Sequence, residues 1–310
     1  MNSTNSQQMN VPFFNYKALY NRQREEILKV FDEVCGRGAY ILQRDVTDFE
    51  KNICEFLGVK HAVSVANGTD GLIIALKAAG IQPGDEVILP SHTYVATAAS
   101  VALTGGKPVL VECGKDHMTD PQAMEKAITS KTRFLMPVQV NGRTCNMDAI
   151  MEIAKRHKLI VIEDAAQALG SKFKGKCAGT FGLASMFSLY PAKLLGCFGD
   201  GGVNVTNDDE MARKMRLWRD HGRDDNGDVV AWGLNSRLDN MQAALLNFKF
   251  KTYPEEIKRR REIAGLYHQR LSTLKQLALP PGPHENVDYF DVYQNYEIEA
   301  DRRDQLKAYL

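Results

Sequence analysis

From about residue 60 onward, short apolar runs alternate with amphipathic stretches along the chain. This alternation is typical of a parallel sheet covered by helices, so it predicts an α/β fold. Several runs carry apolar residues at both alternating positions, which is typical of strands buried on both faces. The predicted strands cover residues 61–66, 86–90, 107–112, 133–140 and 159–164.

Between these runs, apolar residues recur at helical spacing. Pro121 stands early in one such stretch and Gly80 follows another, which are positions where proline and glycine commonly mark helix ends. We therefore expect repeated β-α-β units from about residue 60 to 165. The predicted helices cover residues 71–80, 95–105, 121–128 and 148–158.

The second half of the chain begins with two more predicted strands, 184–191 and 201–207, on either side of the glycine-rich stretch LLGCFGDGG. We expect a hairpin or crossing loop there. Beyond residue 208 the pattern becomes helical, and it includes a long charged helix from Glu255 to about Leu274. One more strand, 292–300, and a helix from about Asp301 are predicted before the sequence stops.

The length of 310 residues exceeds what one compact core usually supports, so we expect two unequal domains. The predicted division is a flexible N-terminal arm at 1–15, a large domain at 16–250 and a small C-terminal domain at 251–310. The last helical pattern has no glycine or asparagine cap after it, so the small domain looks incomplete.

Charge and composition exclude several classes of protein. With 39 basic and 38 acidic residues, the net charge of +1 gives no reason to expect nucleic-acid or membrane binding. Six cysteines lie far apart without a C-x-x-C pair, as expected for reduced thiols in a cytoplasmic protein. The sequence contains no G-x-G-x-x-G before a helix, no phosphate-binding P-loop and no His/Cys grouping with metal-ligand spacing, so no metal is predicted.

Candidate chemistry lies just after the predicted strands, because ligands of open α/β sheets bind outside the carboxyl ends of strands. After 61–66 come Asn67, Gly68, Thr69 and Asp70, followed directly by a helix. The free backbone N–H groups of a helix N-terminus suit a phosphate. Taken alone, however, this stretch is more typical of an ordinary helix N-cap.

Two further candidates are charged residues in apolar surroundings. Asp164, with Glu163, ends an otherwise apolar strand, where it acts either as a helix N-cap or as counter-ion to a protonated ring nitrogen. Both interpretations remain open at this point. Lys193 follows a strand within FSLYPAKLLG, and burial there would favour its neutral, nucleophilic amine. A lone lysine is a weak signal, so the case depends on the combination.

Five segments, taken in order, resemble a known family. They are FEKNICEFLGVKHAVSVANGTDGL, PGDEVILPSHTYVATAAS, IEDAAQALGSKFKGK, FSLYPAKLLGCFGDGG and GLNSRLDNMQAA. Through them the chain, from about residue 40 to 310, is similar to the DegT/DnrJ/EryC1/StrS family of sugar aminotransferases. The resemblance implies a fold-type-I enzyme dependent on pyridoxal 5'-phosphate (PLP), with a seven-stranded, mainly parallel sheet and a smaller C-terminal α/β domain.

The resemblance also implies roles around the cofactor ring. Lys193 matches the lysine that carries the cofactor as a Schiff base. Asp164 matches the carboxylate paired with the pyridine nitrogen, which keeps the ring protonated as an electron sink. Gln167 matches the side chain beside the phenolic oxygen, and Tyr94 matches the aromatic side chain that stacks on the ring.

For the cofactor phosphate, Gly68, Thr69 and Ser188 match the residues that hold it. Asn235 matches an asparagine that reaches the phosphate of the neighbouring subunit, so the resemblance implies a homodimer with shared active sites. His221 and Arg223 are candidates for contacting an anionic substrate, although a charged loop is more typically an exposed one.

The implied reaction is transfer of an amino group, usually from L-glutamate, through pyridoxamine 5'-phosphate (PMP) to a nucleotide-linked keto-sugar. A 3- or 4-keto-6-deoxy sugar, used for amino-sugar and surface-polysaccharide biosynthesis, fits best. One branch of the family has histidine in place of the lysine and acts as a PLP-dependent sugar dehydratase; Lys193 favours transamination. Because the chain stops early relative to the family, a regulator or inactive partner subunit without turnover is the alternative.

Overall fold

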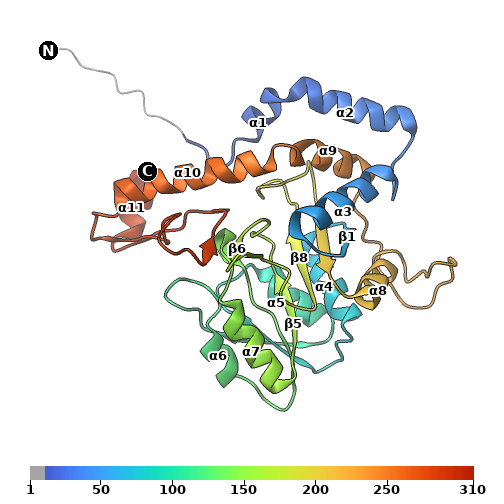
Figure 1. The fold of residues 1–310 in the computed structure, drawn as a ribbon, viewed down its shortest axis with the longest axis horizontal. Coiled ribbons are helices and arrows are strands. Elements are labelled where there is room, and N and C mark those ends of the chain that lie inside the picture. The colour runs from blue at the N-terminus through green and yellow to red at the C-terminus, as the bar shows by residue number, and fades with distance from the viewer. Residues whose placement is uncertain (1–10) are drawn as a thin grey trace.

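The computed structural model describes residues 11–310, and residues 1–10 of the predicted N-terminal arm lie outside the described part (Figure 1). A seven-stranded sheet forms its centre, in the order β1-β9-β8-β5-β4-β2-β3. Only β9 runs antiparallel to its neighbours. The α/β prediction is therefore confirmed. The strands are β1 (His61–Val65), β2 (Glu86–Pro90), β3 (Lys107–Val111), β4 (Thr132–Leu135), β5 (Ile160–Asp164), β8 (Ala184–Ser188) and β9 (Gly202–Thr206).

Burial along the strands follows their position in the sheet. All five residues of the inner strand β2 are buried, as predicted from its apolar pattern. In β3, by contrast, only Val111 is buried, so the expectation of burial on both faces is wrong for this strand. β3 is an edge strand that the helices cover less than β1, the strand at the other edge, whose residues 62–65 are buried.

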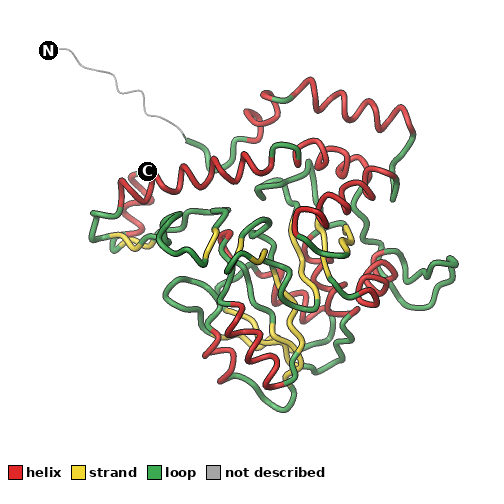
Figure 2. The backbone as a smooth tube through the Cα atoms, viewed as in Figure 1, coloured by secondary structure: helices red, strands yellow, loops and turns green. Residues whose placement is uncertain are grey.

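Helices cover both faces of the sheet, giving three layers (Figure 2). Side chains that alternate along a strand point to opposite faces, so Val63, Phe134 and Ile162 pack with one helix group. Ala62, Leu135 and Val161 pack on the other side. The first group is α4 (Gly68–Ala78), α5 (Val95–Leu103) and α8 (Asp209–Arg219); the second is α3 (Arg44–Leu57), α6 (Pro121–Lys126), α7 (Met147–His157) and α9 (Asn240–Phe250).

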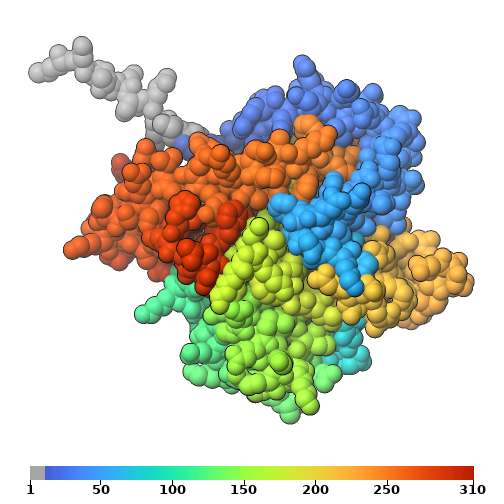
Figure 3. Space-filling view, in the orientation of Figure 1, coloured from blue at the N-terminus to red at the C-terminus, as the bar shows by residue number. Residues whose placement is uncertain are grey.

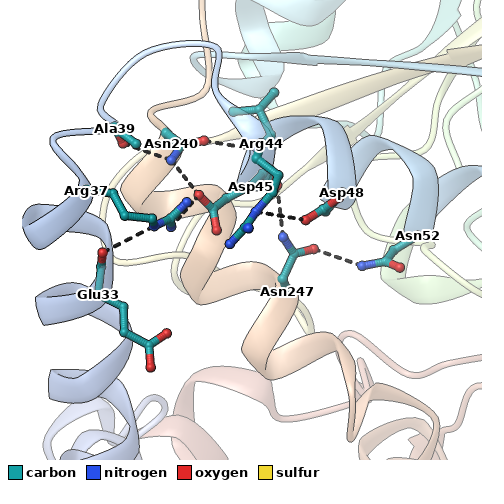
Figure 4. A network of polar contacts seen from close by, with 10 residues as sticks. Glu33, Arg37, Ala39, Arg44, Asp45, Asp48, Asn52, Asn240 and Asn247 are labelled. Atoms are coloured by element: carbon teal, nitrogen blue, oxygen red, sulfur yellow. Dashed lines mark hydrogen bonds and ion pairs between the residues drawn. The ribbon is translucent and has the colours of Figure 1, made fainter.

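Among residues 11–310, three helices precede the sheet: α1 (Tyr16–Arg22), α2 (Arg24–Arg37) and α3. The apolar side chains of α3 that recur at helical spacing are all buried against the sheet and α9. Polar groups then tie α2, α3 and α9 together (Figure 4). Asp45 accepts hydrogen bonds from Arg37 at 2.8 Å and from Asn240 at 2.7 Å.

After α9 come α10 (Tyr253–Leu271) and a mostly irregular C-terminal segment. The predicted strand 292–300 is wrong except at β12 (Glu299–Ala300), because residues 292–295 bond to loops of the sheet body instead of to a neighbouring strand. Figure 3 shows this segment packed against residues near 140–180. The remaining elements are β6 (Lys172–Phe173), β7 (Lys176–Cys177), β10 (Leu277–Ala278), β11 (Tyr289–Phe290), the 3-10 turn η1 (Val140–Gly142) and α11 (Arg303–Tyr309).

The predicted strand 133–140 is also shorter than expected, because β4 ends at Leu135, two residues before Pro137. Proline has no N–H to donate to a neighbouring strand. No helix within residues 11–310 is long and apolar enough to cross a membrane. The predicted domain boundary near residue 250 stays a prediction.

Candidate active site

A cavity of about 610 Å³ opens where β1, β5 and β8 end. These three strands run in the same direction, so their carboxyl ends meet at one edge of the sheet. The volume is in the range of pockets that hold small organic ligands. Seven of the eight residues that the resemblance assigns to the cofactor line this cavity: Gly68, Thr69, Tyr94, Asp164, Gln167, Ser188 and Lys193.

Asp164 is the last residue of β5 and is 5% exposed. Burial raises the pKa of its carboxyl group, while hydrogen bonds and the nearby Lys193 amine oppose this shift. Thr97 of α5 donates to Oδ2 at 2.7 Å, and the backbone N–H of Ala166 donates to Oδ1 at 3.2 Å. The carboxylate is thus held in one orientation, facing the cavity from the sheet end.

Glu163, the neighbouring carboxylate, has a different environment. Successive side chains of a strand point to opposite faces, so Glu163 points away from the cavity into the protein. Four donors at 2.7–2.9 Å surround its carboxylate oxygens. The hydrogen bonds from three backbone N–H groups to Glu163 hold the turn before β8 in place, so Glu163 has a structural role. The four donors are the N–H groups of Gly179, Phe181 and Gly182 and the side-chain amide of Gln139.

Lys193 lies in the loop between β8 and β9, where its backbone N–H donates to the carbonyl of Tyr190 at 2.8 Å. Burial lowers the pKa of its amine, and the negative charge of Asp164 opposes this shift. The neutral amine is therefore more accessible than for a lysine in water, as the sequence suggested. A neutral amine can act as a nucleophile or accept a proton.

Gln294 of the C-terminal segment holds this loop on both sides of Lys193. Its amide nitrogen donates to the carbonyl of Ala192 at 2.8 Å, and its amide oxygen accepts from the N–H of Leu194 at 3.0 Å. The side chain is 6% exposed. Sequence reasoning missed Gln294 because the contact joins residues about 100 positions apart. It also missed Thr97, although Thr97 stands three residues after Tyr94 in the same motif.

The start of α4 forms the far end of the cavity. The side chain of Asn67 caps the helix by accepting from the N–H of Asp70 at 2.8 Å, so the N-cap interpretation is correct. The same helix N-terminus faces the cavity through Gly68 and Thr69. A Cβ at Gly68 would lie 3.0 Å from the sulfur of Met186 and 3.3 Å from Cβ of Ser188. Glycine therefore lets the start of α4 pack closely against β8, which brings the helix end next to Ser188.

Gln167 and Tyr94 complete the lining. The amide oxygen of Gln167 accepts from the backbone N–H of Asn141 at 2.7 Å, which leaves its NH₂ group free to donate into the cavity. Tyr94, the residue before α5, is 77% exposed at the cavity mouth. Its ring is thus free to stack on a ligand.

Three predicted residues do not line this cavity: His221, Arg223 and Asn235. They lie together beyond α8, where His221 bonds to the carbonyl of Leu234 and Arg223 pairs with Asp220 at 2.9 Å. The role assigned to Asn235 concerns the neighbouring subunit, which the cavity of one chain does not test. All three assignments stay predictions.

Comparison with known proteins agrees with this geometry. Residues 21–310 match the model of the DegT/DnrJ/EryC1/StrS aminotransferase family. The chain belongs to this family. The family is PLP-dependent, and the seven-stranded fold is that of its aminotransferases.

Three similar proteins are informative. A pleiotropic regulatory protein of Geobacillus stearothermophilus is 43% identical, over 97% of this chain and 81% of the relative. The dTDP-3-amino-3,4,6-trideoxy-alpha-D-glucose transaminase of Streptomyces venezuelae is 40% identical, over 99% and 81%. The structure of NtdA from Bacillus subtilis with bound PMP is 31% identical, with a TM-score of 0.89, over 98% of this chain and 69% of that one.

Proposed function

We propose that this chain is a PLP-dependent aminotransferase that moves an amino group from L-glutamate to a nucleotide-linked keto-sugar of the 3- or 4-keto-6-deoxy type. One observation carries the proposal. A single cavity brings together a buried lysine, a hydrogen-bonded carboxylate and a helix N-terminus, namely Lys193, Asp164 and the start of α4. The transaminase relative from Streptomyces venezuelae supports the sugar class.

The residues present fit PLP at both ends. The helix N-terminus at Gly68 and Thr69, next to Ser188, offers N–H and hydroxyl groups to a phosphate. Asp164, at the sheet end, offers a fixed negative charge to a protonated ring nitrogen. The free NH₂ group of Gln167 suits the phenolic oxygen. When bound, the cofactor supplies an electron sink for charge on the carbon that bears the amine.

The side chains of this chain then have distinct tasks. Nζ of Lys193 would hold the cofactor covalently, and the same amine would move a proton at the substrate carbon. Burial lowers the pKa of this amine, so its neutral, basic form is more accessible than that of a lysine in water. The hydrogen bond from Thr97 favours the charged form of Asp164, and this charge would favour a protonated ring nitrogen. Tyr94, exposed at the cavity mouth, would stack on the ring.

The proposal includes a homodimer in which Asn235 reaches the phosphate site of the other subunit. Its support is the match of GLNSRLDNMQAA to the family, and the position of Asn235 outside its own chain's cavity is compatible with it. His221 and Arg223, on the same loop, remain the candidates for contacting the anionic nucleotide.

A second function has one specific observation in its favour. The relative that is 43% identical carries the name of a regulatory protein, so the same fold without turnover is the competing proposal. The presence of Lys193 and Asp164 in one cavity favours the enzyme, because a regulator has no need of a lysine with a lowered pKa.

One experiment separates the two functions. The PLP-loaded protein is incubated with L-glutamate and a panel of nucleotide-linked keto-sugars, and amino-sugar products are measured by mass. The enzyme proposal expects one product whose amino group carries ¹⁵N from labelled glutamate, and no product with Lys193→Ala. Cofactor binding without conversion to PMP by any amino donor would favour the regulator.

A further inference from the structure

Outside the cavity, three metal-ligating side chains from distant parts of the sequence lie together. They are His92 before α5, His117 in the turn between β3 and α6, and Glu297 in the C-terminal segment. Their ligand atoms all lie within 4.8 Å of one another. Nε2 of His92 is 3.7 Å, and Nδ1 of His117 is 4.0 Å, from Oε1 of Glu297. The fold, not the sequence spacing, creates this group.

A second observation concerns the other atoms of these side chains. Nε2 of His117 lies 2.6 Å from a carboxylate oxygen of Glu299, which can only accept, so Nε2 donates this bond and the other ring nitrogen, Nδ1, lies on the side of Glu297. This carboxylate–histidine pairing is the arrangement that orients metal-binding histidines. Asn141 donates to Oε2 of Glu297, which leaves Oε1 turned toward the histidines. Residue His117 also has a φ of 63°, a strained value for a non-glycine residue.

We propose that His92, His117 and Glu297 bind a divalent transition-metal cation such as Zn²⁺. Zinc takes nitrogen and carboxylate ligands at about 2.0–2.2 Å, so neighbouring ligand atoms of a tetrahedral site lie roughly 3.4 Å apart. The two histidine–carboxylate separations are 3.7 and 4.0 Å and all three ligand atoms lie within 4.8 Å of one another, so side-chain movements can bring them to the spacing of a metal site. The three side chains are 27–41% exposed, so water can reach the group and fill the fourth position.

Such a cation links the C-terminal segment to the sheet body. Glu297 and Glu299 belong to that segment, whereas His92 and His117 belong to loops at the ligand edge of the sheet. Asn141 connects the group to the cavity, because its side chain bonds to Glu297 and its backbone N–H bonds to Gln167. Metal binding therefore holds the segment beside the cavity.

The test is calorimetric titration of the full, chelator-treated chain with Zn²⁺ alone, with Mg²⁺ as a second probe. We expect one Zn²⁺ per chain and no Mg²⁺ binding, because Mg²⁺ prefers oxygen ligands. His92→Asn, His117→Gln and Glu297→Gln should each abolish the zinc isotherm or weaken it at least tenfold. Glu299→Gln, which leaves all three ligands in place, should weaken it by about 10–100-fold.

His268→Gln is the matched control. It removes the histidine of another His–Glu pair, in which Nε2 of His268 is 2.8 Å from Glu285, so zinc binding should be unchanged. Circular dichroism checks that each variant folds without metal. If a ligand variant does not fold, the parent and Glu299→Gln still decide the question. Absence of stoichiometric Zn²⁺ binding by the parent, or equal affinity in parent and Glu299→Gln, overturns the proposal.

Discussion

The two walls of the cavity are built in different ways. Asp164 ends a sheet strand, and its hydrogen-bond partners, Thr97 and Ala166, lie at the starts of the segments that follow strands. Lys193, opposite, stands in an irregular loop that is held by Gln294 from the C-terminal segment. The fixed charge of the site therefore depends on the sheet, and the position of the reactive amine depends on a long-range contact.

The largest expected effect comes from substituting the two adjacent carboxylates, Glu163 and Asp164, one at a time. Asp164→Asn removes the charge that faces the cavity, so we expect turnover to fall on the order of 10²–10³-fold with little change in unfolding. Glu163→Ala leaves several buried donors without an acceptor, so we expect a loss of roughly 3–5 kcal/mol of stability.

Turnover assays and denaturant unfolding of both variants check this prediction. Glu163→Gln serves as the conservative control. Glutamine keeps the shape of the side chain, but its NH₂ group replaces one carboxylate oxygen, so it can no longer accept hydrogen bonds from all four donors. If Asp164→Asn retains full turnover, or if Glu163→Ala is as stable as the parent, the assignment of the two carboxylates is wrong.

The next effect concerns the opposite wall. Gln294→Ala removes both hydrogen bonds that flank Lys193, so the loop should loosen and turnover should fall about tenfold, which corresponds to roughly 1.4 kcal/mol. Hydrogen exchange of residues 190–197 should accelerate, whereas exchange at the end of β5 should not change. Asn295→Ala, at the neighbouring position, is the control. Unchanged hydrogen exchange of residues 190–197 in Gln294→Ala would contradict the role of Gln294 in holding this loop.

A smaller effect is expected from the hydrogen bond to Asp164. Thr97→Val removes a donor that opposes the burial-induced rise in the pKa of Asp164, so this pKa rises further. As the pH falls, the carboxylate of Asp164 is then protonated at a higher pH than in the parent. The acid limb of the pH–rate profile should therefore move to higher pH, with a several-fold loss of rate below neutrality. Thr97→Ser keeps the hydroxyl group and should restore the parent profile.

The smallest effect is on stability. Burial lowers the pKa of Lys193 below its ordinary value of 10.5, so the unfolded chain binds more protons than the folded chain between the two values. Stability of the cofactor-free protein should therefore rise with pH across that interval. Lys193→Met removes the free-energy cost of burying a group that is protonated in the unfolded chain. It should therefore raise Tm slightly at neutral pH, and the gain should vanish above pH 10.5. An equal gain at every pH would rule out the titration of Lys193 as its cause.

The same contrast explains what the sequence could predict. Strands and helices after residue 60 follow from local apolar patterns, and Gly68 and Asp164 stand directly next to them. For this reason the side of the cavity formed by Gly68 and Asp164 could be predicted from local sequence. The role of Lys193 needed the family resemblance as well, because burial of a loop lysine depends on what packs over it.

Features that depend on distant segments were not predicted. Residues 292–298 have a strand-like pattern, but Gln294 and Asn295 use their side chains to bond to loops of the sheet body. The pairing of Glu297 with His92 likewise joins residues about 200 positions apart in sequence. Neither contact leaves a local periodic signal.

The most direct test of the account is to find the lysine that binds PLP. The protein is mixed with PLP and reduced with borohydride, and the peptide that gains the phosphopyridoxyl mass is identified. Lys249 is a stringent competitor, because burial lowers its pKa as well. The account predicts modification at Lys193 with one group per chain. Modification at Lys249 or another lysine, or no specific modification, would contradict it.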